Sequence, residues 1–417
     1  MVINQFHPIV GGAERQAQKL AKGLIERGVD VEVLTSRRRG WKKRELVDGV
    51  PVRRHRVFYI PLGRRKFCYT LFYVVQVFLY LLWHRKSFDI LHTHQAMYPA
   101  FVASLAARLL RKPSIVKIGN SAQRFDLTNL QSKPLLGRFM VRSLCKNTDW
   151  FVAISSHIRD DLERFGVALE KILFIPNGVD MPHAHPRPAA SRDGAPRFVA
   201  GFLGTLSKVK NVETVLRAWA ALPVHVREQC QLLIVGDGPQ RDRLEFRAGE
   251  LGIANRTTFC GRQSDVSHWL GRMDCYVSMS CVEGLSNSLL EAMAHGKACI
   301  VSDGVSGNVD LIQDGENGFL VPPTDHTRLA ERLATLAGNR EFLRQLGEHA
   351  SRTVARSCAM PAIVNRYIAL YQQVAPPGEA DRREFSLFGP SKAFRADPSS
   401  SSPGRAVKQL CRNSRKL

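Results

Sequence analysis

The segment CYVSMSCVEGLSNSLLEAMAHGKACIV, residues 275–301, decides the fold of this chain. An apolar run of strand length opens it at Cys275–Met279, and a second run closes it at Ala298–Val301. Between the two runs, SLLEAMAHG has the composition and apolar spacing of a helix. A strand, a helix and a strand in this order form a βαβ unit with parallel strands. The segment therefore predicts an α/β protein built on parallel sheets.

The same alternation of strands and helices continues on both sides of this segment. The other strand candidates are Val31–Thr35, Ile90–Thr93, Ser114–Ile118, Phe151–Ile154, Ile172–Ile175, Phe198–Leu203, Gln231–Val235 and Thr257–Phe259. A chain of 417 residues is too long for one ordinary core. We therefore expect two doubly wound, Rossmann-like domains that face each other across a central cleft, where such folds bind their ligands.

Composition sets the expected boundaries of these domains. Residues 182–196 are rich in Pro, Ala and polar residues without periodicity, which predicts a linker between a domain at 1–181 and a second at 197–360. A helix is expected over 361–375, where it could cross back to the first domain. Residues 376–417 are Pro- and Ser-rich and basic, which predicts a disordered tail.

The turn between the strand at 275–279 and the following helix has the features of an anion site. Gly284 permits a tight turn, and Ser286–Asn287 can cap the helix. The free N–H groups and the positive dipole end of a helix N-terminus suit a diphosphate. Glu283 precedes the helix, and Glu291 lies one turn inside it, where it could accept hydrogen bonds from a ribose diol. The alternative is a capped surface helix with two incidental glutamates.

Several motifs resemble a known family when they are taken together in this order. The segment 281–296 resembles the E-x7-E signature of the retaining GT4 glycosyltransferases, which have the GT-B fold. The resemblance covers residues 1–374 and includes GGAE (11–14), FLGTLSKVKN (202–211), GDGP (236–239), DVSHWLGRMDCYVSMS (265–280) and GENGFLVPPTD (315–325). It implies a first domain that binds the acceptor and a second domain that binds a nucleotide-sugar.

The resemblance also implies roles for individual residues. Glu283 would contact the donor sugar, and Glu291 the ribose. Lys210 would neutralise the diphosphate, and His94 would lie near the reacting sugar, although a histidine at a strand end is as often a packing residue. The phosphates would be held by backbone amides of Gly11, Gly12, Leu285, Ser286, Asn287 and Ser288.

The chain departs from the family pattern at one position of the donor site. Thr205 stands where the family usually has an arginine, and a hydroxyl cannot replace a guanidinium fork. Lys208 is a candidate for the substitute charge.

The expected chemistry needs no metal and no resident cofactor. No D-x-D sequence occurs in the chain, so a metal-bridged diphosphate has no obvious ligands. Lys210 and the helix dipole would neutralise a UDP- or GDP-linked donor instead. The resemblance implies transfer with retention of the anomeric configuration.

The positive charge of the chain is concentrated in its first half. Residues 1–180 hold 30 Lys and Arg against 14 Asp and Glu, whereas residues 181–375 hold 21 against 19. Without a recognisable nucleic-acid module, this distribution fits an anionic membrane, which attracts each nearby basic residue by about 1 kcal/mol, or a phosphorylated acceptor. Solvated surface charge alone is the alternative.

The uncharged run FCYTLFYVVQVFLYLLW, residues 67–83, bears on the same question. It is predicted to be a helix buried in the first domain or a helix docked on a membrane, and its 17 residues fall short of the usual span.

We therefore expect a glycosyltransferase of cell-surface polysaccharide or lipopolysaccharide synthesis. Its acceptor would be a glycan or a lipid-linked glycan. The nine cysteines form no CxxC pair and the N-terminus has no secretory pattern, which favours the cytoplasm and the cytoplasmic face of the membrane. The alternatives are a nucleotide-sugar epimerase of the same fold and a non-catalytic protein that binds a membrane or a partner.

Overall fold

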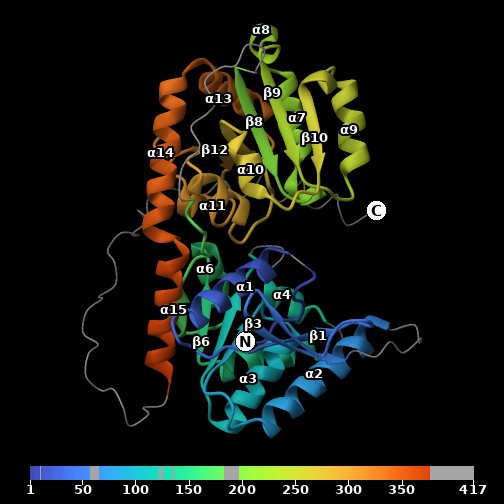
Figure 1. Ribbon diagram of the computed structural model, residues 1–417, viewed down its shortest axis with the longest axis vertical. Helices are drawn as coiled ribbons and strands as arrows, with labels where there is room; N and C mark the ends of the chain where they lie inside the picture. The colour runs from blue at the N-terminus through green and yellow to red at the C-terminus, as the bar shows by residue number, and fades with distance from the viewer. Residues whose placement is uncertain (10, 57–64, 122–124, 134–135, 183–196, 376–417) are drawn as a thin grey trace.

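The computed structural model describes residues 1–375 except residue 10 and the segments 57–64, 122–124, 134–135 and 183–196. The predicted tail at 376–417 and nearly all of the predicted linker at 182–196 therefore lie outside the described residues. Figure 1 shows two α/β domains one above the other, the lower from the first half of the chain and the upper from the second.

The first domain is built on a sheet whose two parts are joined by the first residues of the chain. One part has the order β1-β3-β2 and the other the order β4-β5-β6-β7. Val2 lies between them and forms parallel bridges to Leu34 in β1 and to Thr93 in β4. The strands are β1 (Val33–Arg37), β2 (Arg44–Val47), β3 (Val50–Arg56), β4 (Leu91–His94), β5 (Ser114–Ile118), β6 (Trp150–Ala153) and β7 (Ile172–Phe174).

The helices of the first domain cover both faces of this sheet. They are α1 (Gly12–Ile25), α2 (Arg65–Trp83), α3 (Tyr98–Leu110), α4 (Asp126–Gln131), α5 (Gly137–Asn147) and α6 (Ser156–Arg164), with a 3-10 turn at Leu169–Lys171. The antiparallel hairpin of β2 and β3 is absent from the sequence prediction. Its edge strand β2 is RELV, in which three of four side chains are not buried, so it has no apolar run to reveal it.

The second domain contains a fully parallel sheet in the order β10-β9-β8-β11-β12-β13. The strands are β8 (Phe198–Leu203), β9 (Cys230–Val235), β10 (Thr257–Gly261), β11 (Cys275–Ser278), β12 (Ala298–Ser302) and β13 (Phe319–Val321). The helices are α7 (Val212–Ala220), α8 (Val224–Arg227), α9 (Arg241–Glu250), α10 (Val266–Gly271), α11 (Asn287–Ala294), α12 (Asn308–Leu311), α13 (His326–Gly338) and α14 (Arg340–Ser357), with 3-10 turns at Lys208–Lys210 and Ala254–Arg256. The predicted unit at 275–301 is β11, α11 and β12.

The last described helix, α15 (Met360–Val374), belongs to the core of the first domain. Figure 1 shows it running from the end of α14 down the side of the lower domain. Its buried residues Ile363, Val364 and Tyr367 pack with Leu20 and Leu24 of α1. The chain therefore crosses from one domain to the other twice.

Helix α2 contains the uncharged run, and over residues 72–83 it is buried on one side only. Tyr73, Val77 and Leu81 are buried against the domain, whereas Leu79 and Trp83 are 42% and 81% exposed. No helix among the described residues is long and apolar enough to cross a membrane.

Candidate active site

A cleft of about 850 Å³ lies between the two domains. It is lined by every residue that the sequence singled out for the site except Lys208, which is exposed outside it. The predicted residues that the fold brings together there are Gly11, Gly12, His94, Thr205, Lys210, Glu283, Leu285, Ser286, Asn287, Ser288 and Glu291.

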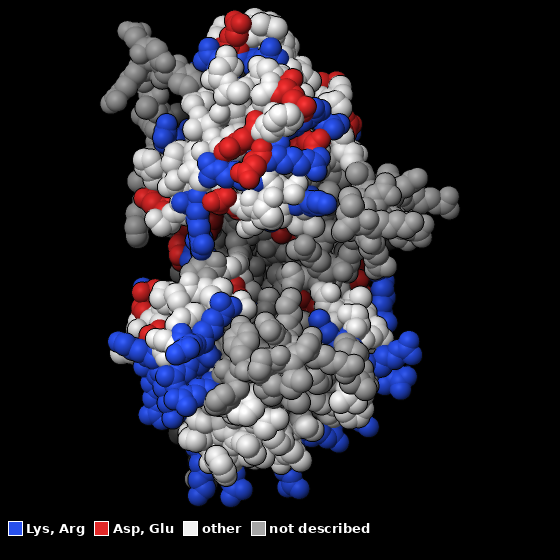
Figure 2. All heavy atoms as spheres, turned by 90° about the vertical axis from the view of Figure 1, so that its right-hand side faces the viewer, with Lys and Arg blue, Asp and Glu red and all other residues white. Residues whose placement is uncertain are grey.

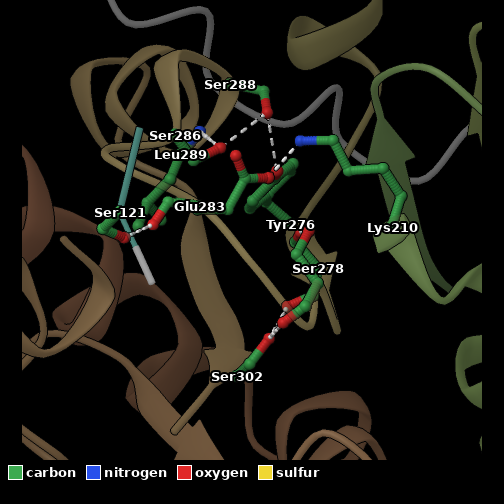
Figure 3. A network of polar contacts seen from close by, with 10 residues as sticks. Ser121, Lys210, Tyr276, Ser278, Glu283, Ser286, Ser288, Leu289 and Ser302 are labelled. Carbon is green, nitrogen blue, oxygen red and sulfur yellow. Dashed lines mark hydrogen bonds and ion pairs between the residues drawn. The ribbon is translucent and has the colours of Figure 1, made fainter. Parts of the chain in front are cut away.

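Hydroxyl groups fix the start of α11 at the cleft. Ser286 is the N-cap residue, and its Oγ accepts a hydrogen bond from the backbone N–H of Leu289 at 3.4 Å. Ser288 Oγ lies 3.1 Å from Ser286 Oγ and 2.8 Å from the hydroxyl of Tyr276, which reaches it from β11 (Figure 3). Burial raises the pKa of Tyr276 to about 12. A neutral, buried phenol thus holds the first turn of α11 in place.

The side chain of Asn287 does not cap α11, as its position suggested it would, but forms hydrogen bonds with residues of the first domain. Its amide Nδ2 donates to the carbonyl oxygen of Gly12 at 3.1 Å. Its Oδ1 accepts from Gln16 Nε2 at 3.1 Å and from Asn177 Nδ2 at 3.0 Å. Asn287 therefore connects the start of α11 to the start of α1 in the other domain. Gln16 and Asn177 were not identified from the sequence, because their partner lies 271 and 110 residues away.

Glu283 and Lys210 form an ion pair in the cleft (Figure 3). Lys210 ends the 3-10 turn that follows β8, and Asn211 after it adopts a left-handed conformation with φ of 49° and starts α7. The side chain of Lys210 is 22% exposed and that of Glu283 is 15% exposed, so the ion pair is accessible from the cleft. A fixed cation and a carboxylate are thus held side by side at the start of α11.

The backbone around Glu283 also touches the first domain. Ser121 Oγ donates to the carbonyl oxygen of Glu283 at 2.7 Å. At Gly284, a Cβ atom would lie 2.2 Å from the carbonyl oxygen of Gly119, which leaves room for glycine alone. Asp126 holds this first-domain loop, because its carboxylate accepts from Gly119 N–H at 3.2 Å and from Asn120 Nδ2 at 2.8 Å.

Glu291 lies one turn further along α11 and is mostly buried. Burial raises the pKa of its carboxyl group, and the nearby cations Lys19 and Arg15 oppose this shift. Among the described residues, no side chain donates a hydrogen bond to this carboxylate. It is therefore an acceptor that lines the cleft and lacks a protein partner.

The N-terminus of α1 forms the facing wall of the cleft. Gly11 is extended, with φ of −110° and ψ of −174°, and the helix begins at Gly12. A Cβ atom at Gly12 would lie 2.9 Å from Asn287 Nδ2, so the close approach of the two helices requires a small residue there. Glu14 also lines the cleft, and burial raises the pKa of its carboxyl group.

His94 is placed in the cleft at the end of β4. It is 3% exposed, stacks on His92 with ring centroids 4.6 Å apart, and has no hydrogen-bond partner at Nε2. Burial lowers the pKa of His94 well below its ordinary value, so the ring is neutral. Thr205 lines the cleft, and so does Arg262 after β10, a cation that the sequence reading had not singled out. Among the described residues, no group of His, Cys, Asp and Glu could hold a metal ion.

Two Rossmann-like domains with a cleft between them form the GT-B fold, as predicted. The structure of HepE from Anabaena in complex with UDP and glucose superimposes with a TM-score of 0.71, at 21% identity, over 89% of this chain and 98% of that chain.

The family follows from the sequence comparisons. The family described as Glycosyltransferase Family 4 matches residues 10–182, and the family described as Glycosyl transferases group 1 matches residues 189–353. The chain belongs to the GT4-type glycosyltransferases.

Two relatives match over nearly their whole length. N-acetyl-alpha-D-glucosaminyl L-malate synthase of Bacillus anthracis is 28% identical over 88% of this chain and 95% of its own. The lipopolysaccharide core biosynthesis glycosyltransferase LpsE of Rhizobium meliloti is 26% identical over 89% of this chain and 98% of its own.

Proposed function

We propose that the cleft holds a nucleotide-sugar and transfers its sugar to a glycan or lipid-linked acceptor. The observation that carries this proposal is the Lys210–Glu283 ion pair at the N-terminus of α11, with the unpartnered Glu291 one turn beyond. The helix N-terminus and Lys210 would hold the diphosphate, Glu283 the sugar and Glu291 the ribose. The amides of the Gly11–Gly12 loop would complete the phosphate site.

The reaction would proceed without a metal and with retention at the anomeric carbon. As the glycosidic bond to the nucleotide breaks, negative charge grows on the leaving diphosphate, where a permanent cation and a helix dipole stabilise it. The leaving phosphate would take the proton of the acceptor hydroxyl, which attacks from the same face. His94, neutral and without a partner at Nε2, would lie beside the sugar.

The comparisons favour a UDP-linked donor and a surface glycan as acceptor. HepE was crystallised with UDP and glucose, and LpsE is named for the lipopolysaccharide core. A GDP-linked donor is the alternative.

A basic, apolar face of the first domain would dock on anionic membrane at its cytoplasmic side. This docking face is formed by α2, α3 and α5, of which α3 packs against both others. No Asp or Glu occurs in residues 65–86, 98–112 or 137–147. The exposed basic residues of the face are Arg85, Lys86, Arg108, Arg111, Arg138, Arg142 and Lys146. Its exposed apolar residues are Phe72, Val75, Leu79, Trp83, Leu109, Leu136 and Phe139.

The distribution of charge over the surface agrees with this orientation. In Figure 2, Lys and Arg dominate the lower part of the first domain, whereas both signs lie side by side on the second domain. An acid-free face with apolar side chains suits an acidic lipid surface better than solvent alone, because both apolar burial and charge attraction contribute.

Incubation with labelled UDP- and GDP-sugars and a lipid extract tests the proposed transfer. Label that moves only when acceptor is present supports it. Release of a free isomerised sugar without acceptor would identify an epimerase instead. Nucleotide binding without either reaction would identify a binding protein that kept the fold.

Glu291→Ala is expected to weaken the binding of a nucleoside diphosphate by about 10- to 100-fold. The change removes a charged acceptor, and hydrogen bonds to charged groups are worth about 1.5–3 kcal/mol. Titration calorimetry with UDP and GDP measures the effect. Glu331→Ala, at an exposed position of α13, is the matched control. Equal affinity of Glu291→Ala and the control would exclude the ribose role.

Leu79→Glu combined with Trp83→Glu is expected to reduce binding to phosphatidylglycerol vesicles at least tenfold. Burial of one large apolar side chain contributes about 1.5–3 kcal/mol, and each new carboxylate is repelled by the lipid. Vesicle co-sedimentation measures the loss. Val224→Glu, at an exposed position of α8 in the second domain, should bind like the unaltered protein. If the double variant also binds the vesicles like the unaltered protein, α2 does not dock on lipid.

A further inference from the structure

Lys117 is a buried lysine that the proposed donor chemistry does not use. It lies at the end of β5 and is 5% exposed, yet it lines the cleft. No carboxylate among the described residues forms an ion pair with it. Its Nζ lies 5.8 Å from the ring centroid of Tyr367. Burying an ammonium group without an anionic partner costs free energy. A lysine in this position at the wall of a cleft therefore points to an anionic ligand.

His94 stands beside Lys117 on the same wall. The two residues are register partners on the adjacent parallel strands β4 and β5. Both are more than nine-tenths buried, and Nε2 of His94 has no partner either. The carboxylate of Asp126 is not paired with Lys117 and instead accepts hydrogen bonds from the backbone N–H groups of Ala96 and Gly119 and from Asn120 Nδ2. Two unsatisfied polar side chains are thus presented to the cleft from neighbouring strand ends.

We infer that Lys117, with His94 beside it, binds an anionic group of the acceptor, a phosphate or a carboxylate. This inference rests on the proposed function, since it assigns the substrate class of the same cleft. The donor diphosphate has its own cation, Lys210, and its own amides at the start of α11 and in the Gly11–Gly12 loop. Lys117 belongs to the opposite domain, on strands whose ends carry none of those groups. An acceptor fixed there by its charge would present its hydroxyl toward Glu283 and the donor sugar.

Calorimetric titrations of inorganic phosphate and of succinate into the UDP-saturated protein test this inference. Lys117→Met is expected to weaken the binding of the preferred anion at least about tenfold, because a charge-assisted contact is lost, while UDP affinity is unchanged. Lys42→Met, at an exposed position between β1 and β2, is the control. Tighter binding of phosphate would indicate a phosphorylated acceptor, and tighter binding of succinate a carboxylated one.

Three outcomes would overturn the inference. These are no binding of either anion, equal binding by Lys117→Met, and displacement of the anion by UDP, which would place Lys117 in the donor site. Titrations of the anions without nucleotide distinguish this inference from the proposed donor site. If the protein binds neither UDP nor GDP, the donor site is contradicted. The anion affinities of the unaltered protein and of Lys117→Met still test the role of Lys117 in that case.

Proton uptake gives a second measurement that does not depend on the variant folding. Burial lowers the pKa of Lys117 to about 7, so at pH 8 the side chain is mostly neutral before an anion binds. A bound anion raises this pKa, and succinate itself does not titrate at pH 8. Binding should therefore take up as much as one proton, measured by calorimetry in two buffers of different ionisation enthalpy. Binding without proton uptake would overturn the role of Lys117.

Discussion

Lys210→Met should lower the rate of sugar transfer by about 100- to 1000-fold, or about 2.7–4 kcal/mol, the cost of removing one donor from the developing charge of a transition state. The lysine is held at the end of a 3-10 turn and is paired with Glu283. A donor diphosphate would share this cation as it leaves. Since the charge grows during bond cleavage, most of the loss should fall on kcat and less on KM.

Two further variants test whether the loss comes from the charge of Lys210 itself. Lys210→Arg keeps the charge and should recover part of the lost rate. Lys208→Met tests the exposed lysine two residues earlier, which was the sequence candidate for replacing the arginine absent at position 205. Steady-state kinetics over a range of donor concentrations separate the effects. Transfer by Lys210→Met at an unchanged rate, or a larger loss in Lys208→Met, would contradict the assignment of Lys210.

Gly284→Ala should reduce transfer by at least about 100-fold, because a misplacement near 1 Å is enough to cost that much in catalysis. The new Cβ would lie 2.2 Å from the carbonyl oxygen of Gly119 and 3.3 Å from Cα of Asn120. Both are backbone atoms of the other domain, so no side chain can move aside. Either the domains separate or the loop that carries Glu283 shifts away from Lys210.

The control for this variant is another glycine of the second domain. Gly249 lies in α9, and a Cβ there would meet nothing within 4 Å. Gly249→Ala should therefore keep full activity and gain slightly in stability, since alanine favours a helix. Small-angle scattering of Gly284→Ala would show whether the molecule opens. Full transfer activity in Gly284→Ala would mean that the contact between Gly119 and Gly284 is not needed for catalysis.

The segment from Glu283 to Glu291 shows how much of the site local sequence can specify. Glu283, the cap at Ser286 and Glu291 fall within nine consecutive residues. Their relative placement follows from one turn and one helix, whose geometry is regular. The cap at Ser286 was therefore predictable, and so was the βαβ unit around it. At Asn287 local reasoning failed, because the amide has a tertiary partner that a pattern cannot show.

The first domain was harder to anticipate. The β2–β3 hairpin lies at a sheet edge and has exposed charged side chains, so it lacks an apolar run. The sequence predicted a helix at α2, but it did not show which face of that helix packs against the domain. Lys117 was read only as part of the strand at 114–118, because its burial beside His94 depends on the pairing of β4 and β5.

The sequence by itself determined the class of fold, because that follows from periodicities along the chain. It indicated the family through the resemblance of several motifs, and it placed Glu283, Ser286 and Glu291 together through short spacings. The tertiary structure decided how the two halves of the site meet. Asn287 reaches Gly12 across 275 residues, and Ser121 reaches Glu283 across 162. The physical reason is that such contacts arise from the packing of two separately built domains, and no local pattern of residues encodes that packing.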